Sequence, residues 1–233
     1  MSHDNLAALP GNAVKYAPKN AVHLPNSPLA NQHVAFLGSS ITLGAGSLDQ
    51  SFVDYLVSQD NLIAVKSAVN GTTLAGKSTN GYLTRLQDEI PQNVNYDAFV
   101  CQLSTNDTRH DKQLGQISAG NQLTDFDVET TTGALELILA YVQQHWHCPV
   151  LFYTCLRTDK DTDYQLLIQQ LYELTDKWDF EILDLNHDTE VQQETTAHPA
   201  AMLDDAHPTQ LGYRDIWTPR FRKILTEMIA TKN

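Results

Sequence analysis

Two adjacent serines stand at the end of a short apolar run near the start of the chain. Residues 33–42 read HVAFLGSSIT, so the apolar residues stop at Gly38 and are followed by Ser39 and Ser40. This pattern predicts a short buried strand that runs directly into a tight turn. In an open α/β sheet, ligands and catalytic groups collect at the carboxyl ends of the strands. A serine in this turn is therefore a candidate nucleophile, provided that a base lies within reach.

A candidate base and a carboxylate to orient it occur together late in the chain, in Asp204-Asp205-Ala206-His207-Pro208. A serine hydroxyl is a weak nucleophile at neutral pH, and histidine suits the role of its base because its pKa lies near that pH. A carboxylate on the other ring nitrogen fixes the tautomer and stabilises the imidazolium. The spacing favours Asp204 for this role and leaves Asp205 as a surface acid. The alternative is that both are solvated acids attracted by the positive end of the next helix.

Two further strand ends carry groups that could donate hydrogen bonds to an oxyanion, namely Asn70-Gly71 and Thr105-Asn106. A tetrahedral intermediate requires such donors. The candidates are the backbone amides of Ser40 and Gly71 and the side-chain amide of Asn106. Glycine at position 71 would let a substrate approach closely, because glycine has no Cβ. The alternative is that the serines and the Asn-Gly pair only form turns, and that Asn106 only caps or turns the chain.

Apolar periodicity predicts five strands that alternate with helices. The strands are expected at residues 33–38, 62–66, 98–103, 149–155 and 180–185, and the helices at 52–57, 82–90, 135–146, 164–178 and 208–228. A capping-box pattern at residues 47–50 is expected before the first helix. Pro208 is expected in the first turn of the last helix. Such alternation implies a parallel sheet with helices on both faces, because the crossover connections are right-handed.

The remaining segments are expected to lack regular structure. Residues 1–31 contain four spaced prolines, so helix or strand is not expected there, and the segment is either an extended arm against the domain or a partly disordered lead-in. Residues 32–233 are predicted to form a single domain. Residues 109–127 are predicted to be a loop long enough for an insertion or lid. Asp107 and His110, at its start, could touch substrate, but such residues are most often plain loop.

Composition excludes several classes of protein. A net charge of −13 over 233 residues disfavours binding to nucleic acid and to anionic membranes. No apolar run approaches the ~18 residues of a membrane helix. The first residues lack the basic and apolar parts of a secretory signal, so a cytoplasmic location is expected. Three cysteines are too few and too irregular for a disulfide framework. The oligomeric state is not indicated by the sequence.

No metal or other cofactor is predicted. His145, His147, Cys148 and Cys155 resemble metal ligands by residue type, but their spacing fits no standard zinc site. The two cysteines flank or lie within an apolar strand, which favours buried thiols instead.

The candidate residues together resemble the SGNH superfamily, also called the GDSL-type hydrolases. Gly38-Ser39-Ser40-Ile41 is similar to the first block of the family, which places the nucleophile at Ser40. Gly71 resembles the glycine of the second block, Asn106 the asparagine of the third, and Asp204-x-x-His207 the last. The blocks follow the family order between residues 38 and 207. The resemblance implies a flavodoxin-like, three-layer α/β/α domain that hydrolyses carboxylic esters without a metal.

Two positions depart from the family pattern. Ser39 stands where the first block most often has aspartate, and Ser104 where the third usually has glycine. Neither position supplies a triad or oxyanion group, so the chemistry is retained, while the turn geometry and the activity could change.

The leading hypothesis from the sequence is a serine esterase that acts on small acyl or acetyl esters through an acyl-enzyme. Ser40 attacks, His207 transfers the proton, Asp204 orients His207, and Ser40, Gly71 and Asn106 bind the oxyanion. The same machinery would serve a carbohydrate O-deacetylase or an acyltransferase. A non-catalytic flavodoxin-like binding domain is the remaining alternative, since fold alone does not settle function. In that reading the Asp204-x-x-His207 pair would have no purpose.

Overall fold

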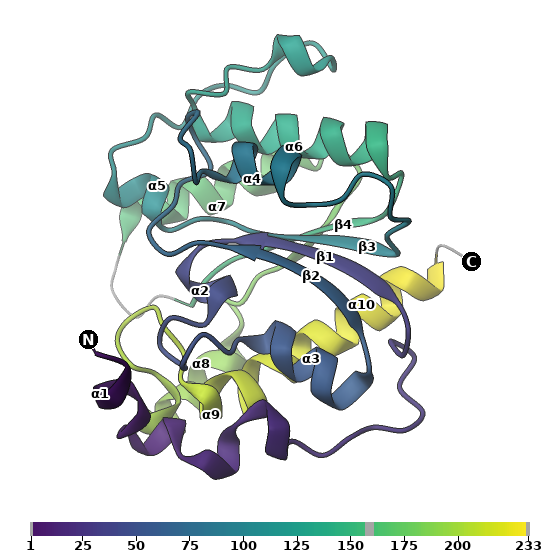
Figure 1. Cartoon of the computed structure of the whole chain (residues 1–233). Helices are drawn as coiled ribbons and strands as arrows, with labels where there is room; N and C mark the ends of the chain where they lie inside the picture. The colour runs from purple at the N-terminus through teal and green to yellow at the C-terminus, as the bar shows by residue number, and fades with distance from the viewer. Residues whose placement is uncertain (1, 157–160, 232–233) are drawn as a thin grey trace.

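The computed structural model describes residues 2–156 and 161–231 and is built around one five-stranded sheet (Figure 1). The strands are β1 (His33–Gly38), β2 (Ile63–Ala68), β3 (Ala98–Gln102), β4 (Val150–Tyr153) and β5 (Glu181–Leu183). All neighbours are parallel, in the order β2-β1-β3-β4-β5. This is the strand order of flavodoxin-like folds. The five predicted strands and the predicted fold class are confirmed.

Helices cover both faces of the sheet (Figure 1). One face carries α4 (Tyr82–Asp88), α6 (Thr131–His145) and α7 (Thr162–Leu174), and the other carries α3 (Phe52–Asp60) and α10 (Thr218–Thr231). Right-handed crossovers require this division, because the chain leaves β1 in one direction along the sheet and leaves β2 in the other. The central strands are buried on both sides, which explains why their sequences are continuous apolar runs.

Helices α3 and α10, which are far apart in the sequence, pack against each other on the same face of the sheet. The rings of Phe52 and Phe221 stack with centroids 3.7 Å apart and planes at 6°. The hydroxyl of Tyr213 donates to the carbonyl of Ile41 at 2.6 Å. These contacts fix the helical stretch that follows His207 against the turn that follows β1.

Several short helices complete the fold. They are α1 (His3–Ala7), α2 (Ser40–Leu43), α5 (Asn106–Arg109), α8 (Thr189–Ala197), α9 (Gln210–Gly212), the π-helical η6 (Tyr213–Trp217), and the 3₁₀ turns η1 (Pro10–Asn12), η2 (Val14–Tyr16), η3 (Pro18–Asn20), η4 (Leu123–Asp125) and η5 (Pro199–Ala201). The sequence did not predict α8, in which only Val191 and Thr195 are buried, so apolar periodicity is absent. Among the described residues, no helix has the length and apolar character needed to cross a membrane.

The first long helix begins at Phe52, as predicted, but the predicted capping box lies four residues too early. The capping box is made by Ser51 and Asp54, not by residues 47–50. The backbone N–H of Ser51 donates to the Asp54 carboxylate at 2.7 Å. Leu48 and Asp49 have φ values of 61° and 58°, which a helix does not allow, so residues 44–50 form an irregular turn after α2.

The predicted position of Pro208 is also wrong. The helical stretch begins at Gln210, with Thr209 as its N-cap, so Pro208 precedes the helix instead of occupying its first turn. Pro208 forms an isolated antiparallel bridge with Met202, which closes the loop between them. The predicted helix 164–178 ends early, at Leu174.

The amino-terminal segment is more regular than its prolines suggest. It contains α1 and the 3₁₀ turns η1, η2 and η3, although the sequence predicts no helix there. Pro10 and Pro18 each occupy the first position of a 3₁₀ turn, where a missing N–H costs nothing. Figure 1 shows the segment lying along the side of the molecule that carries α8 and α9.

The predicted loop at 109–127 contains the last residue of α5 and the short η4 turn. It is attached to α6 through the buried carboxylate of Glu136, which accepts from the backbone N–H of Ser118 at 2.8 Å. Lys177 pairs with Glu136 and donates to the carbonyls of Ser118 and Gly120 at 2.6 and 2.7 Å. A buried charge is costly unless it is paired, so Glu136 and Lys177 stay together. Since both also bond to the backbone of the loop, they attach it to α6.

Candidate active site

Ser40 lies where β1 turns into α2, at the carboxyl edge of the sheet. Ser39 separates the two elements with φ −116° and ψ −142°, and Ser40 is the first residue of α2. A Cβ at Gly38 would lie 1.7 Å from the Thr42 hydroxyl, so the tight turn requires glycine there. The first N–H groups of a helix lack an intrahelical acceptor, which leaves the Ser40 amide available to a ligand.

His207 and Asp204 lie beside Ser40 in a continuous hydrogen-bonded chain. Nε2 of His207 is 2.9 Å from Oγ of Ser40, although the two residues are 167 positions apart. Nδ1 of His207 is 2.9 Å from both carboxylate oxygens of Asp204. With the Nδ1 proton directed at the carboxylate, Nε2 is free to accept the proton of the serine hydroxyl.

The loop that carries Asp204 also stabilises the negative charge of its carboxylate. Partial burial raises the pKa of Asp204, but hydrogen bonds from the His207 ring and from the backbone amides of Ala206 and His207 outweigh burial, so the pKa lies well below its usual value. The two amides donate to Oδ1 at 2.9 and 2.8 Å. The carboxylate is therefore ionised at neutral pH and can stabilise a protonated imidazole.

Asn106 and the loop after β2 face the same edge of the sheet. Asn106 begins α5, and its Nδ2 donates one hydrogen to the carbonyl of Thr72 at 2.9 Å. An amide nitrogen carries two hydrogens, so one remains for another acceptor. Its backbone N–H donates to the Ser104 hydroxyl at 3.1 Å, and that hydroxyl lies 3.2 Å from the Thr72 carbonyl. Ser104 thus connects the two loops at a position where the sequence pattern expects glycine.

Gly71 has a conformation that suits glycine and open space around it. Its φ is +75°, in the left-handed region, and a Cβ at this position would meet no atom within 4 Å. Among the described residues its backbone N–H has no hydrogen-bond acceptor. Gly71 thus lies in the loop after β2 with open space beside it.

Ser39, the departure from the family pattern, is paired with a residue that the sequence analysis did not single out. Nε2 of Gln102 donates to the Ser39 hydroxyl at 2.9 Å, and its Oε1 accepts from the Ser39 backbone N–H at 2.9 Å. The same Oε1 accepts from the Thr42 hydroxyl at 2.9 Å. One buried amide at the end of β3 thus holds both ends of the turn that presents Ser40. A polar residue within an apolar strand was the available signal.

Asp107, which the sequence analysis named as a possible substrate contact, supports the loop that carries Gly71. Its buried carboxylate accepts from the backbone N–H groups of Leu74 and Ala75 at 2.8 and 2.9 Å and from the Thr131 hydroxyl at 3.1 Å. Burial raises the pKa of Asp107, and these hydrogen bonds oppose the rise. Because Asp107 follows Asn106, it holds the Gly71 loop against α5.

Arg85 of α4 is a second buried residue that the sequence analysis missed. Its guanidinium donates to the Gly38 carbonyl and the Ser67 hydroxyl, both at 2.7 Å, and to the Thr72 hydroxyl at 3.3 Å. Burial lowers the pKa of Arg85. The guanidinium joins the end of β1, just before Ser40, to the loop that carries Gly71. The pattern of apolar residues in α4 does not distinguish this buried arginine from an exposed one.

The chain contains three Asp-x-x-His spacings, at residues 107–110, 184–187 and 204–207, and in the described part of the chain the one at 184–187 has no serine at its histidine. Asp184 and His187 follow β5, and Nδ1 of His187 lies 2.8 Å from the Asp184 carboxylate. Its Nε2 bonds to Gln165 at 2.8 Å, and no serine occupies that place. Asp205, next to Asp204, forms an ion pair with Arg109 at 3.3 Å.

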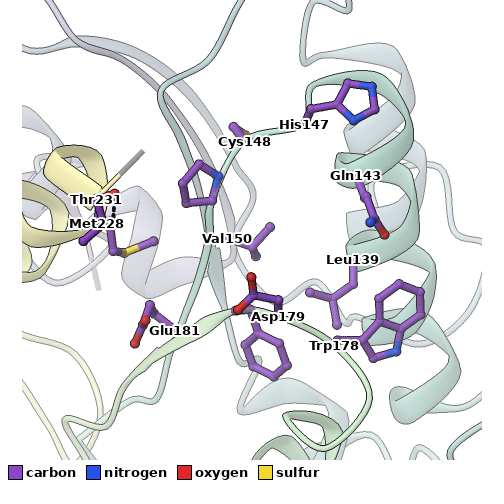
Figure 2. A pocket seen from close by; sticks show the side chains of 12 residues that line it. Leu139, Gln143, His147, Cys148, Val150, Trp178, Asp179, Glu181, Met228 and Thr231 are labelled. Atoms are coloured by element: carbon purple, nitrogen blue, oxygen red, sulfur yellow. Dashed lines mark hydrogen bonds between the residues drawn. The ribbon is translucent and has the colours of Figure 1, made fainter. Parts of the chain in front are cut away.

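A cavity of about 500 Å³ lies at the opposite, amino edge of the sheet and contains none of these groups. Figure 2 shows His147, Cys148, Asp179 and Glu181 among the side chains that line it. Cys155 lies apart from it, buried with Sγ 3.7 Å from the carbonyl of Leu103. In the described part of the chain, no three histidine, cysteine or acidic side chains are grouped so that they could hold a metal ion.

A parallel sheet with a hydrogen-bonded serine, histidine and aspartate at its carboxyl edge is typical of serine hydrolases. Residues 36–214 match the model of the GDSL-like lipase/acylhydrolase family. The chain therefore belongs to this family and is a carboxylic ester hydrolase.

Solved structures show the same fold. A protein from Lactobacillus plantarum is 21% identical, with a TM-score of 0.65 over 85% of this chain and 98% of that one. A candidate GDSL-like lipase from Bacteroides ovatus is 13% identical, with a TM-score of 0.60 over 85% and 99%. An acetyl xylan esterase from Butyrivibrio proteoclasticus is 15% identical, with a TM-score of 0.50 over 89% and 65%. A search of curated protein sequences finds no significant match.

Proposed function

We propose that the protein is a serine esterase that hydrolyses small carboxylic esters through an acyl-enzyme. The observation that carries this proposal is the hydrogen-bonded chain from Ser40 Oγ through both ring nitrogens of His207 to Asp204. In the proposed reaction, His207 accepts the proton of Ser40 as the hydroxyl attacks the ester carbonyl. The protonated imidazole then gives this proton to the leaving alkoxide, and Asp204 stabilises its charge.

The oxyanion of the tetrahedral intermediate is assigned to three donors: the backbone amides of Ser40 and Gly71 and the second hydrogen of Asn106 Nδ2. Pre-formed donors of this kind supply a large part of the stabilisation in acyl transfer. In the second half of the reaction, His207 removes a proton from the water that attacks the acyl-enzyme. It then gives this proton to Ser40 Oγ as the acyl–Oγ bond breaks and the acid is released. Every proton transfer in this scheme passes through Nε2 of His207, so one correctly held imidazole serves both steps.

A small acyl group is favoured because the reacting groups are recessed. Ser40 is 5% exposed and Asn106 is 8% exposed, so the attacked carbonyl has to enter a recess to reach both residues. A series of p-nitrophenyl esters of increasing chain length tests this point, and we expect the highest kcat/KM for acetate. Acetylated sugars and a competing alcohol, assayed beside the series, distinguish a deacetylase and an acyltransferase from a simple esterase.

Replacing Ser40 by alanine tests the proposal directly. The variant loses the nucleophile, so hydrolysis of p-nitrophenyl acetate and labelling by a fluorophosphonate should both fall to background. Ser58→Ala is the matched control, because Ser58 lies on α3 and its hydroxyl donates to the carbonyl of Tyr55 within the same helix. Turnover by Ser40→Ala at the wild-type rate would overturn the proposal.

A further inference from the structure

Asn12 is a buried polar residue outside the segment that matches the family. The family match begins at residue 36, whereas Asn12 ends the η1 turn of the amino-terminal segment. The residue is 3% exposed. Burying an amide is unfavourable unless its hydrogen bonds are satisfied, so the partners of Asn12 indicate what its burial accomplishes.

The side chain of Asn12 connects three separate segments. Its Nδ2 donates to the carbonyls of Leu6 and Gly46 at 2.9 and 3.0 Å. Its Oδ1 accepts from the backbone N–H of Gln210 at 2.9 Å. Both amide hydrogens are therefore used, and all three bonds are to backbone. A planar amide with three fixed partners determines their relative positions.

Two of these partners belong to the turns that carry Ser40 and His207. Gly46 follows α2, in a turn where the N–H groups of Gly44 and Ala45 both donate to the Ser40 carbonyl at 2.9 Å. Gln210 lies three residues after His207. Asn12 thus spans from the turn of the proposed nucleophile to the turn of the proposed base.

The two turns also touch at Gly46. A Cβ at Gly46 would lie 2.8 Å from the Pro208 carbonyl oxygen and 3.0 Å from the Cβ of His207. Because the two turns pass this close to each other, a shift of either turn would change the distance from His207 to Ser40. The Gln210 side chain adds a parallel link, with Nε2 donating to Gln50 at 2.7 Å.

We propose that Asn12 is a positioning residue that sets the separation of Ser40 Oγ and His207 Nε2. The inference rests on the proposed roles of Ser40 and His207. Asn12 touches neither the substrate nor the reacting atoms. It acts by holding the turn after Ser40 and the turn after His207 in one arrangement, which makes the amino-terminal segment a contributor to the active site.

Two variants test this role. Asn12→Ala removes all three bonds, and Asn12→Asp keeps an acceptor for the Gln210 N–H but places carboxylate oxygen against the carbonyls of Leu6 and Gly46. The control is Asn20→Ala, because Asn20 is exposed and its Nδ2 donates to the Val14 carbonyl within the same segment. The readouts are kcat and KM for p-nitrophenyl acetate and the rate of Ser40 labelling by a fluorophosphonate.

We expect kcat and the labelling rate to fall roughly 10- to 100-fold in both Asn12 variants, as small misplacements of catalytic groups do, with KM little changed. Asn20→Ala should keep the wild-type kcat. A purely structural role would lower the unfolding temperature and leave the kcat of the folded enzyme unchanged. The assays are therefore run in the cold, on protein whose circular dichroism matches wild type.

A kcat near the wild-type value in either folded variant overturns the positioning role, and so does failure of both variants to fold in the cold. The underlying function has a separate outcome. If Ser40→Ala retains activity, the proposed function itself fails. If Ser40→Ala is inactive while Asn12→Ala is fully active, only the positioning role fails.

Discussion

Replacing Asp204 by asparagine should abolish most of the activity by changing the tautomer of His207. In the wild-type protein, the Ala206 and His207 amides both donate to Oδ1 of Asp204, and Nδ1 of His207 lies 2.9 Å from each carboxylate oxygen. In the variant, the side-chain oxygen of the new asparagine must accept the hydrogen bonds from the backbone N–H groups of Ala206 and His207. The NH₂ group then occupies the position of Oδ2, facing Nδ1.

An NH₂ group only donates, so Nδ1 must become the acceptor and the ring proton must move to Nε2. A protonated Nε2 cannot take the proton of Ser40, which lies 2.9 Å away. The expected loss in kcat is about 10⁴-fold, as for the loss of tautomer control in other serine triads. This corresponds to about 5 kcal/mol in the activation free energy.

The assay is hydrolysis of p-nitrophenyl acetate, with circular dichroism and thermal unfolding to show that the variant is folded. The matched control is Asp205→Asn, one residue away. Its ion pair with Arg109 is partly exposed, and such pairs are worth at most about 1 kcal/mol, so kcat should change little. Asp204→Asn with a kcat within tenfold of wild type, or a larger loss in Asp205→Asn, would refute the reasoning.

Two further predictions concern the loops that support the oxyanion site. Asn106→Ala should lower kcat by roughly 100-fold or more with little change in KM, because an oxyanion donor acts mainly in the transition state. Steady-state kinetics check this, and an unchanged kcat would remove Asn106 from the oxyanion site. Asp107→Ala leaves the buried N–H groups of Leu74 and Ala75 without their acceptor. The free energy of unfolding in urea should fall by about 1–3 kcal/mol for each unsatisfied group. Asp107→Asn, which keeps one acceptor oxygen, should lose less, and equal stability of all three proteins would contradict the assignment.

Much of the fold could be predicted because the sheet is parallel and buried on both faces. Strands such as β3 and β4 are then apolar along their whole length, and their sequences stand out from the amphipathic helices between them. The predictions that failed concern a capping box and a helix whose local sequence patterns were misleading or weak. Ser47 resembled an N-cap, but Leu48 and Asp49 have positive φ values, so the N-cap is Ser51, four residues later. Helix α8 escaped detection because little of it is buried.

Only part of the candidate site was predicted from the sequence. Asp204 and His207 lie three residues apart, so their contact is local and the spacing alone indicated it. Gln102 and Arg85 depend on long-range contacts, since each binds the turn around Gly38 and Ser39 from a distant element. Sequence patterns do not reveal such contacts. The apolar run before Gln102 indicates that this residue is buried but not what it binds, and Arg85 has the same local signature as an exposed arginine.

Ser39 illustrates how a departure from the family pattern can be accommodated. The hydroxyl accepts a hydrogen bond from Gln102, whose Oε1 also receives the N–H of Ser39 and the hydroxyl of Thr42. Gln102 therefore stabilises the turn from the neighbouring strand, and Ser40 is presented at the end of β1 without an acidic neighbour.

The amino-acid sequence by itself determined the alternation of strands and helices, the candidate groups at the strand ends, and the pairing of Asp204 with His207. Each of these depends on periodicity or on residues close together in the chain. The family resemblance indicated that His207 serves Ser40, but only the tertiary structure shows the contact between them, 167 positions apart. It alone shows that Ser39 binds Gln102 and that His187 binds Gln165. The tertiary structure also shows that Asn12 bonds to both the turn after Ser40 and the turn after His207. These contacts form only when the sheet and its crossovers bring distant segments together, and no local pattern encodes them.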